Sequence, residues 1–367
     1  MALSQHPDAQ DAVAEVVGHC LDRLGPAPDL AILFTSGAHV ASTPLIARAV
    51  RRLLRPHHLL GGTAVATVAH RQELEEGPSL VLWAGRTGPV ETFRLAPHPV
   101  QPRLPERMTS GPVVVLADPF NFDAAALVGR LGPQEVLVGG LTSAAGRPGG
   151  NHLVLDDEHF SDGAVGVALP DDLDAAAVVA TGCHPVGDPM VVTDAEGPLL
   201  RSLAGRPALD RLERLLADAD EATRNRLRRG LHLGVVLDEH REAFGPGDFL
   251  IRGILGVQRE TRSLAVGAEV AIGTTVQFQV RDAAAATADL ERRLAPFNAE
   301  TALVFTCNGR GSHLFGMPGH DAERLVDSLG TTDVAGMACA GELGPVAGQH
   351  HLHGFTASTL LLGSRAT

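Results

Sequence analysis

Apolar runs alternate with short polar and glycine-rich stretches along the chain, and three segments repeat one order of these features. In the first segment, residues 31–37 form an apolar run without alternation, which is typical of a strand buried on both faces. Residues 43–54 follow with apolar positions at helical spacing. A glycine-containing run at 59–63 and a closing run at 77–84 complete the segment. This order predicts a strand, a helix, a second strand and a closing strand.

Two later segments show the same order of features. Each opens with an apolar run, continues through a helical stretch, and ends in a glycine-containing run and a closing run. The ranges are 113–119, 123–131, 136–143 and 163–169 for the second segment, and 302–309, 321–329, 334–341 and 354–362 for the third. The shared order favours a common origin of the three segments as internal repeats.

The pattern predicts an α/β (α+β) fold built from repeated strand–helix–strand–strand units. We expect mixed β-sheets with helices on the outer faces, because strands buried on both faces need cover. A four-layer αββα sandwich is the alternative arrangement of the same units. The region between the second and third segments does not repeat this order. It begins with an expected turn at 183–185 and a charged amphipathic helix at 209–231. Strands at 233–237, 249–255 and 274–280 and a helix at 282–294 are predicted to follow.

The length of 367 residues favours two domains, because single hydrophobic cores rarely grow beyond about 250 residues. We expect an N-terminal helix or leader at 1–27, a first domain at 28–222 and a second domain at 223–367. The boundary between the two domains is expected in the polar stretch near 215–230.

Composition and charge exclude several classes of protein. The net charge of −13 argues against a nucleic-acid partner, which would require a basic face. All 30 basic residues are arginines, since the sequence contains no lysine. Enzymes that need a Schiff-base lysine, a P-loop lysine or the kinase strand lysine are therefore excluded.

Neither a membrane partner nor a bound cofactor is expected. No apolar run approaches the ~18 residues of a spanning helix, and residues 1–11 lack the regions of a secretory signal. Cys20, Cys183, Cys307 and Cys339 lie far apart, without zinc-finger spacing, and the histidines at 350–353 have no identifiable third ligand. The sequence therefore indicates a cytoplasmic protein with reduced thiols and no metal.

The densest cluster of glycine and polar residues lies in the third segment, at the ends of two predicted strands. If these strands are neighbours, both loops open at one sheet edge, where α/β folds commonly bind ligands. Arg310 offers a donor fork for a carboxylate, and Glu342 could hold an ammonium group, which together would suit an amino acid. The same loops could instead be structural turns with a local ion pair. The candidate ligand-binding residues are Cys307, Asn308, Gly309, Arg310, Gly311, Cys339, Gly341, Glu342, His353 and Arg252.

A thiol-dependent enzyme is the alternative function. A thiol beside backbone N–H groups and an arginine can act as a nucleophile, so Cys307 or Cys339 could serve a hydrolase or acyl transferase, with His353 as base. Neither cysteine lies in a known nucleophile motif, and buried cysteines are commonly apolar fillers. We therefore expect a binding module rather than an enzyme.

Short motifs spread over the chain carry a family resemblance. In the N-terminal part they are EGPSL (76–80), ADPF (117–120), VGGL (138–141), DGAVG (162–166) and GCHPVG (182–187). In the C-terminal part they are DFLIR (248–252), QFQVRD (277–282), CNGRG (307–311), CAGE (339–342) and HGFT (353–356). With these motifs the chain resembles the FIST-domain family, named for F-box and intracellular signal transduction proteins, over about 28–363.

The resemblance implies a sensory module in signal transduction that binds a small ligand, for which amino acids are suggested. Such modules commonly accompany signalling domains, so a chain of this length would act by contacting a separate signalling protein. The family offers no established catalytic residues to carry over, and it raises the loops at 307–311 and 339–342 as pocket walls.

Overall fold

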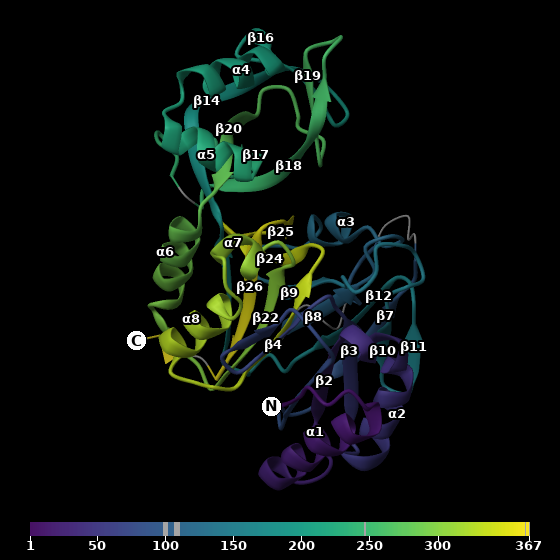
Figure 1. The fold of residues 1–367 in the computed structure, drawn as a ribbon. Coiled ribbons are helices and arrows are strands. Elements are labelled where there is room, and N and C mark those ends of the chain that lie inside the picture. Colours follow the sequence, from purple (N-terminus) through teal and green to yellow (C-terminus); the bar gives the residue numbers. More distant parts are fainter. Residues whose placement is uncertain (98–101, 106–110, 246, 364, 367) are drawn as a thin grey trace. The chain divides into compact units, whose positions relative to one another are not determined.

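The structure is a computed structural model that describes residues 1–97, 102–105, 111–245, 247–363 and 365–366 (Figure 1). The chain forms two compact units. Unit 1 comprises residues 1–179, 290–352 and 356–367, and unit 2 comprises residues 180–289 and 353–355. The chain therefore leaves unit 1 after the second segment and returns to it for the third. The predicted boundary at 222/223 divides the sequence rather than these spatial units and stays a prediction.

In its described residues, unit 1 contains three six-stranded sheets. From one edge to the other, the strands of the first are β1 (Ala2–Ser4), β6 (Ser79–Gly85), β2 (Leu30–Ser36), β3 (His58–Thr63), β10 (Leu153–Leu155) and β11 (Glu158–Phe160). Those of the second are β25 (Gln349–His353), β24 (Glu342–Val346), β9 (Val136–Leu141), β8 (Pro112–Ala117), β12 (Ala164–Ala168) and β7 (Glu91–Leu95). Those of the third are β13 (Ala175–Thr181), β26 (Thr356–Leu362), β22 (Thr301–Cys307), β23 (Val334–Cys339), β4 (Thr67–Ala69) and β5 (Gln72–Leu74).

The three sheets share one central arrangement, which confirms the predicted mixed sheets. Each opening strand (β2, β8 or β22) pairs in parallel with the glycine-containing strand (β3, β9 or β23). On its other side it pairs antiparallel with the closing strand (β6, β12 or β26). The helices α2 (Thr43–Leu53), α3 (Ala124–Val128) and α8 (His320–Leu329) connect the parallel strands. A common origin of the three segments stays a prediction.

Glycine is required where two of these parallel pairs approach most closely. Gly139 is the register partner of Val115, and Gly336 is the register partner of Val304. A Cβ atom at Gly139 would lie 1.9 Å from the Val115 carbonyl oxygen, and one at Gly336 would lie 1.8 Å from that of Val304. No side chain fits at either position, because these separations are far below van der Waals contact.

The three sheets share one hydrophobic core. Phe34 of the first sheet, Val114 of the second and Phe305 of the third belong to the same buried cluster. The rings of Phe34 and Phe305 meet edge to face, with centroids 6.2 Å apart. A four-layer sandwich has two stacked sheets, so that alternative does not describe unit 1.

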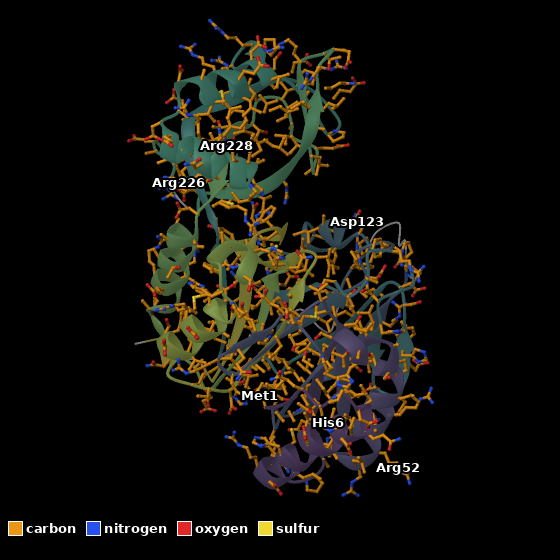
Figure 2. All side chains as sticks on the ribbon, in the orientation of Figure 1. Met1, His6, Arg52, Asp123, Arg226 and Arg228 are labelled. Atoms are coloured by element: carbon orange, nitrogen blue, oxygen red, sulfur yellow. The ribbon has the colours of Figure 1, made fainter. Side chains whose placement is uncertain are left out.

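Helices cover the outer faces of the sheets, as the sequence predicts. Val16 of α1 (Ala9–Leu24) and Val50 of α2 pack with Leu33 of β2 in a second buried cluster. Figure 2 shows side chains filling the space between the elements of unit 1, while Arg52 on α2 and Asp123 before α3 reach outward.

Unit 2 is an antiparallel barrel, which the sequence pattern did not predict. In neighbour order its strands are β14 (Cys183–Glu196), β20 (Thr275–Arg281), β17 (Leu231–Val236), β18 (Phe249–Gln258), β19 (Ser263–Val266), β15 (Leu199–Leu203) and β16 (Arg206–Pro207). An additional pairing between β14 and β15 closes the ring. Val192, Leu233, Val276 and Phe278 belong to the buried cluster of this unit.

Two expectations in this region are wrong. The single helix expected at 209–231 is two helices, α4 (Ala208–Asp218) and α5 (Glu221–Arg229). The break occurs because the Asp220 side chain accepts the Thr223 N–H (2.7 Å) and starts a new helix. The turn expected at 183–185 is instead the beginning of β14, which pairs with β20.

The remaining elements are η1 (Gly37–Ser42), α6 (Ala283–Leu294), α7 (Ser312–Phe315), and the strand pair β21 (Phe297–Asn298) and β27 (Arg365–Ala366). The helix α6 agrees with the helix predicted at 282–294. Across the described ranges, no helix is both long and apolar enough to cross a membrane.

One connection of the first segment belongs to the third sheet. The β4–β5 hairpin lies between β3 and β6 in the sequence, yet β4 pairs antiparallel with β23, with Thr67 opposite Met337. This long-range pairing brings residues 65–68, Glu73 and Glu75 to the carboxyl end of β22. The candidate site forms where the hairpin and β22 meet.

Candidate functional site

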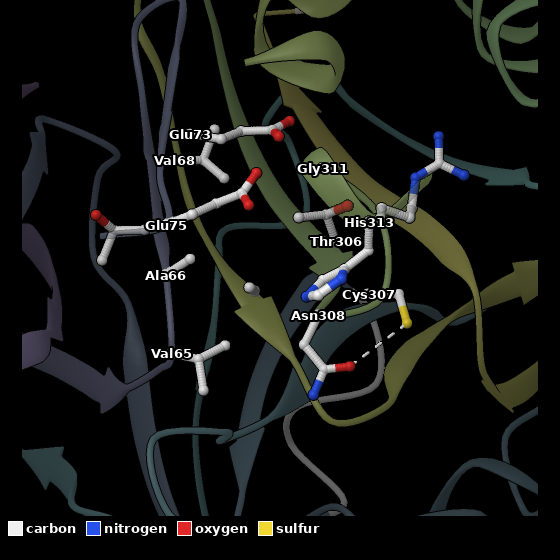
Figure 3. Close-up of a pocket in the computed structure, with 13 residues that line it drawn as sticks. Val65, Ala66, Val68, Glu73, Glu75, Thr306, Cys307, Asn308, Gly311 and His313 are labelled. Carbon is white, nitrogen blue, oxygen red and sulfur yellow. Dashed lines mark hydrogen bonds between the residues drawn. The ribbon is translucent and has the colours of Figure 1, made fainter. Parts of the chain in front are cut away.

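A cavity of about 150 Å³ opens where the β4–β5 hairpin meets the end of β22 (Figure 3). The side chains of Glu73 and Glu75 reach toward it from the hairpin side, opposite Thr306, Cys307 and Asn308. A cavity of this volume holds a molecule the size of benzene. The lining residues are Val65, Ala66, Thr67, Val68, Glu73, Glu75, Thr306, Cys307, Asn308, Arg310, Gly311, His313 and Ala338.

A buried ion pair forms one wall of the cavity. The Arg310 guanidinium donates from Nε to Asp321 Oδ2 (2.6 Å) and from Nη2 to Asp321 Oδ1 (2.8 Å). Both side chains are almost completely excluded from solvent. Burial alone would raise the pKa of Asp321, but the charge and hydrogen bonds of Arg310 bring it well below its usual range. Asp321 is therefore ionised and balances the arginine charge.

Two glutamates, Glu73 and Glu75, accept hydrogen bonds from backbone N–H groups at the N-termini of two helices in the third segment. Glu73 Oε1 accepts the N–H groups of Asp321 (2.9 Å) and Ala322 (3.2 Å), at the start of α8. Glu75 Oε1 accepts the Ser312 N–H (2.8 Å), at the start of α7. Burial, followed by the nearby Asp321 charge, raises the pKa of Glu73 to about 7. Glu73 is therefore poised to gain or lose a proton near neutral pH.

Glu342 is a fully buried carboxyl group on β24, beside the sulfur atoms of the two cysteines. Its Oε2 accepts the Thr356 N–H (3.1 Å) and hydroxyl (2.9 Å). Its Oε1 is buried without a conventional hydrogen bond to the described residues. Burial raises the pKa of Glu342 to about 8 despite the opposing Thr356 bonds. At neutral pH this group is mainly protonated.

Cys307 and Cys339 are register partners on β22 and β23. Cys307 lines the cavity and is 8% exposed, whereas Cys339 is 0% exposed. Burial first, and then the neighbouring Glu342 and Cys307, raise the pKa of Cys339 well above its ordinary value. Cys339 is therefore a protonated thiol at neutral pH.

The structure brings most of the predicted site residues together in unit 1. Cys307, Asn308, Arg310 and Gly311 line the cavity. The Gly309 N–H donates to the Cys307 sulfur (3.4 Å). Behind this wall lie Cys339, Glu342 and Gly341, of which the Gly341 carbonyl accepts the Leu141 N–H (2.8 Å). Their roles in ligand binding stay predictions.

The other two predicted residues belong to unit 2. His353 ends β25 and is buried. Arg252 lies on β18, where burial lowers the pKa of its guanidinium. Their predicted contributions to a ligand site stay predictions, because both lie in a different compact unit from the cavity.

The structure differs from the expectation that Arg310 binds a ligand carboxylate and Glu342 binds a ligand ammonium group. The Arg310 fork is engaged by Asp321, so a ligand carboxylate would have to compete with a buried ion pair. Glu342 does not line the cavity, and its raised pKa removes most of its charge at neutral pH. The carboxylates that do line the cavity are Glu73 and Glu75, which sequence reasoning missed.

The sequence held only a weak signal for the missed residues. Glu73 and Glu75 lie in a connection, and 246 residues separate Glu73 from the Gly319 N–H that it accepts. Asp321 was expected only as the start of a helix. The one sequence signal is the alternation of Glu73, Leu74 and Glu75, which places both carboxylates on one face of a strand.

The fold and site define an α+β protein with a small carboxylate-lined cavity beside a buried ion pair. The FIST N domain model matches residues 29–206, and the FIST C domain model matches residues 208–345. The chain is 39% identical to an uncharacterized protein of Mycobacterium tuberculosis over 98% of each chain. It is 40% identical to an uncharacterized protein of Mycobacterium bovis, over 97% of this chain and 96% of that one. The chain belongs to the FIST family, whose domains are associated with sensory functions in signal transduction.

Proposed function

We propose that this protein is a cytoplasmic sensor that binds a small amino acid in the cavity beside Arg310 and signals through a partner protein. Of the ligands considered from the sequence, an amino acid or another small carboxylate, the amino acid fits better. The observation that carries the proposal is the pair of glutamates, Glu73 and Glu75, in the cavity wall. An ammonium group beside these carboxylates would gain a charge-assisted hydrogen bond.

The cavity also limits the size of the ligand. A volume of about 150 Å³ suits roughly six non-hydrogen atoms, the size of benzene or alanine. Asn308 and His313 are polar, exposed groups at the same wall and are available to the carboxylate end. Occupancy would favour one conformation of the protein, and a partner that distinguishes conformations would read it.

Ligand binding should depend on pH through Glu73. The carboxylate form holds an ammonium group better than the protonated form, and the pKa of Glu73 is raised to about 7. Binding of an amino acid should therefore become tighter as pH rises from 6 to 8 and should release a proton from the protein.

Thermal unfolding against a panel of amino acids, amines and small carboxylates tests the proposal. A ligand at 100 times its Kd should stabilise the protein by ~2.7 kcal/mol. Glu75→Gln keeps an oxygen for the Ser312 N–H but removes the charge, so it should abolish the shift. Glu76→Gln is the matched control, because Glu76 is exposed and does not line the cavity.

Two outcomes would count against this function. If no amino acid or amine shifts the unfolding midpoint, the ligand class is wrong. If Glu75→Gln retains the full shift of the wild type, the ligand lies elsewhere.

A thiol-dependent hydrolase or acyl transferase is the second candidate. Cys307 is favoured over Cys339 as the nucleophile, because it lines the cavity and its sulfur accepts the Gly309 N–H. The expected base, His353, belongs to unit 2, so a Cys307–His353 pair stays a prediction. A pH profile of Cys307 alkylation near that of an ordinary thiol, with a pKa of ~8.5, would reject this enzyme.

A further inference from the structure

We propose that Cys307 and Cys339 form a redox-active dithiol that a small hydroperoxide oxidises to a disulfide between β22 and β23. This modification site is distinct from the ligand-binding role and does not depend on it. Its basis is the placement of two cysteines at one register position, with one sulfur at a cavity wall and the other behind it.

The register of the two strands permits the bond. Cys307 and Cys339 are direct partners in the parallel ladder, so their side chains leave the same face of the sheet. Neighbouring strands lie about 4.8 Å apart, which falls within the roughly 4.4–6.8 Å between the Cα atoms of a disulfide. The Asn308 N–H donates to the Cys339 carbonyl oxygen (2.9 Å) and holds the pair in register.

Exposure assigns different tasks to the two sulfurs. Cys307 lines the cavity, so an oxidant that enters the cavity meets it first. Cys339 is fully buried against β9, where a Cβ atom at Gly140 would lie only 2.2 Å from its sulfur. Cys307 is therefore the attacking thiol, and Cys339 is the resolving thiol.

Local charge supports the same assignment. The Gly309 N–H donates to the Cys307 sulfur, and the Arg310 guanidinium is close enough to interact with the charge of a Cys307 thiolate. Both interactions favour the reactive thiolate. The Cys339 thiol is fully buried, and burial raises its pKa well above the ordinary value and keeps it protonated. The first oxidation step therefore falls on Cys307.

The reaction consists of two balanced steps. The Cys307 thiolate attacks one oxygen of the hydroperoxide, which breaks the O–O bond and gives a sulfenic acid and, after protonation, an alcohol or water. The Cys339 sulfur then attacks the Cys307 sulfur, forms the S–S bond and expels hydroxide. Glu342, which is mainly protonated at neutral pH, is placed to give its proton to the hydroxide, which leaves as water, and to take up the Cys339 proton in its place. The hydroperoxide supplies the oxidising equivalents, and both sulfurs are oxidised.

The experiment oxidises the full-length wild-type protein with hydrogen peroxide and counts thiols after denaturation. Two of the four thiols should be lost, and peptide mapping should find residues 307 and 339 linked. A Cys339→Ser variant should stop at the sulfenic acid, which dimedone traps on Cys307. The wild-type mapping needs no variant, so the proposal remains testable even if Cys339→Ser fails to fold.

Cys20 is the internal control, because it is buried in α1 and its sulfur lies against the Leu82 carbonyl oxygen. Oxidation that leaves Cys307 and Cys339 as thiols, or links either to Cys20, would overturn the proposal. An oxidised protein in which Cys307 carries only sulfinic acid, without the link to Cys339, would also overturn it. The amino-acid shift of the reduced protein is measured separately, so each idea can fail without the other.

Discussion

The ends of β2 and β22 occupy corresponding places in the first and third sheets, but they hold different chemistry. At the end of β2, Ser79 bonds the hydroxyls of Ser36 and Thr67, each at 2.6 Å. The next helix begins beside a hydroxyl pair, Thr35 with Thr43 at 2.7 Å. The hydroxyls at this end of the first sheet are therefore all hydrogen-bonded to other hydroxyls.

At the end of β22, the corresponding threonine donates to a charge. The Thr306 hydroxyl donates to Asp321 Oδ2 (2.9 Å), and the same carboxylate holds Arg310. The comparison shows that the scaffold does not need a buried carboxylate at this place, because Thr35, the corresponding threonine of the first sheet, bonds the Thr43 hydroxyl instead. The buried charges of the third sheet are therefore best understood as part of its cavity.

The largest expected effect is the loss of Asp321. Asp321→Ala leaves the Arg310 guanidinium buried without its balancing carboxylate, which should cost about 3–5 kcal/mol of unfolding free energy. Ser79→Ala at the end of the first sheet should cost only about 1 kcal/mol, because it removes neutral hydrogen bonds. Urea denaturation at pH 7 measures both.

Asp321→Asn refines this test, because its side-chain amide has the shape of the carboxylate but carries no charge. Its cost should lie between those of Asp321→Ala and Ser79→Ala. Equal costs for Asp321→Ala and Ser79→Ala would remove the contrast between the two sheet ends.

A smaller difference in unfolding free energy is expected between alanine substitutions at corresponding glycines of the third and first sheets. Gly336→Ala places a Cβ atom 1.8 Å from the Val304 carbonyl oxygen, and the strand must shift at a cost of roughly 1–3 kcal/mol. Gly61 holds the corresponding position in the first sheet, where the Cβ atom would lie 3.0 Å from the Leu33 carbonyl oxygen. Gly61→Ala should therefore cost less in the same urea titration. A larger loss for Gly61→Ala would show that the first sheet is the tighter one.

The smallest expected effect is a pH dependence that Glu342 of the third segment supplies. The folded state keeps a proton on Glu342 up to about pH 8, whereas the unfolded chain releases it near ~4.3. Stability from this group is fully present below the unfolded pKa and declines as pH rises toward 8, by at most about 1.4 kcal/mol per pH unit.

Glu342→Gln removes this titration, so its unfolding free energy should fall less than that of the wild type between pH 7 and pH 8. Denaturation midpoints of both proteins at the two pH values measure the difference. Parallel declines in the two proteins would mean that Glu342 is ionised in the folded state.

The sequence predicted the central strands of all three sheets because these strands are continuously apolar. For example, β22 begins one residue before the predicted run, and Cys307 and Arg310 at its carboxyl end line the cavity. The carboxylate wall was missed because Glu73 reaches the site through a three-residue strand. Local pattern carries no information about a pairing partner more than 200 residues away.

The barrel of unit 2 was missed for a different reason. Its longest strand, β14, contains Pro185 and Pro189 and shifts register between Val186 and Met190. Proline and glycine in this stretch read as turns, although edge positions and bulges accommodate them in a sheet. Periodicity alone therefore could not separate this bulged strand from a loop.

The β4–β5 hairpin also imposes an order on biosynthesis. Its partner strand β23 ends at Cys339, so a ribosome adding about 5–20 residues per second releases the hairpin roughly 10–50 s before that strand exists. During this interval the hairpin has an unpaired edge, and Glu73 has no helix to cap. Non-local pairing of this kind slows folding. A nascent chain of this protein therefore carries an exposed strand edge for most of its synthesis, and a chaperone that shields such edges would act on residues 65–75.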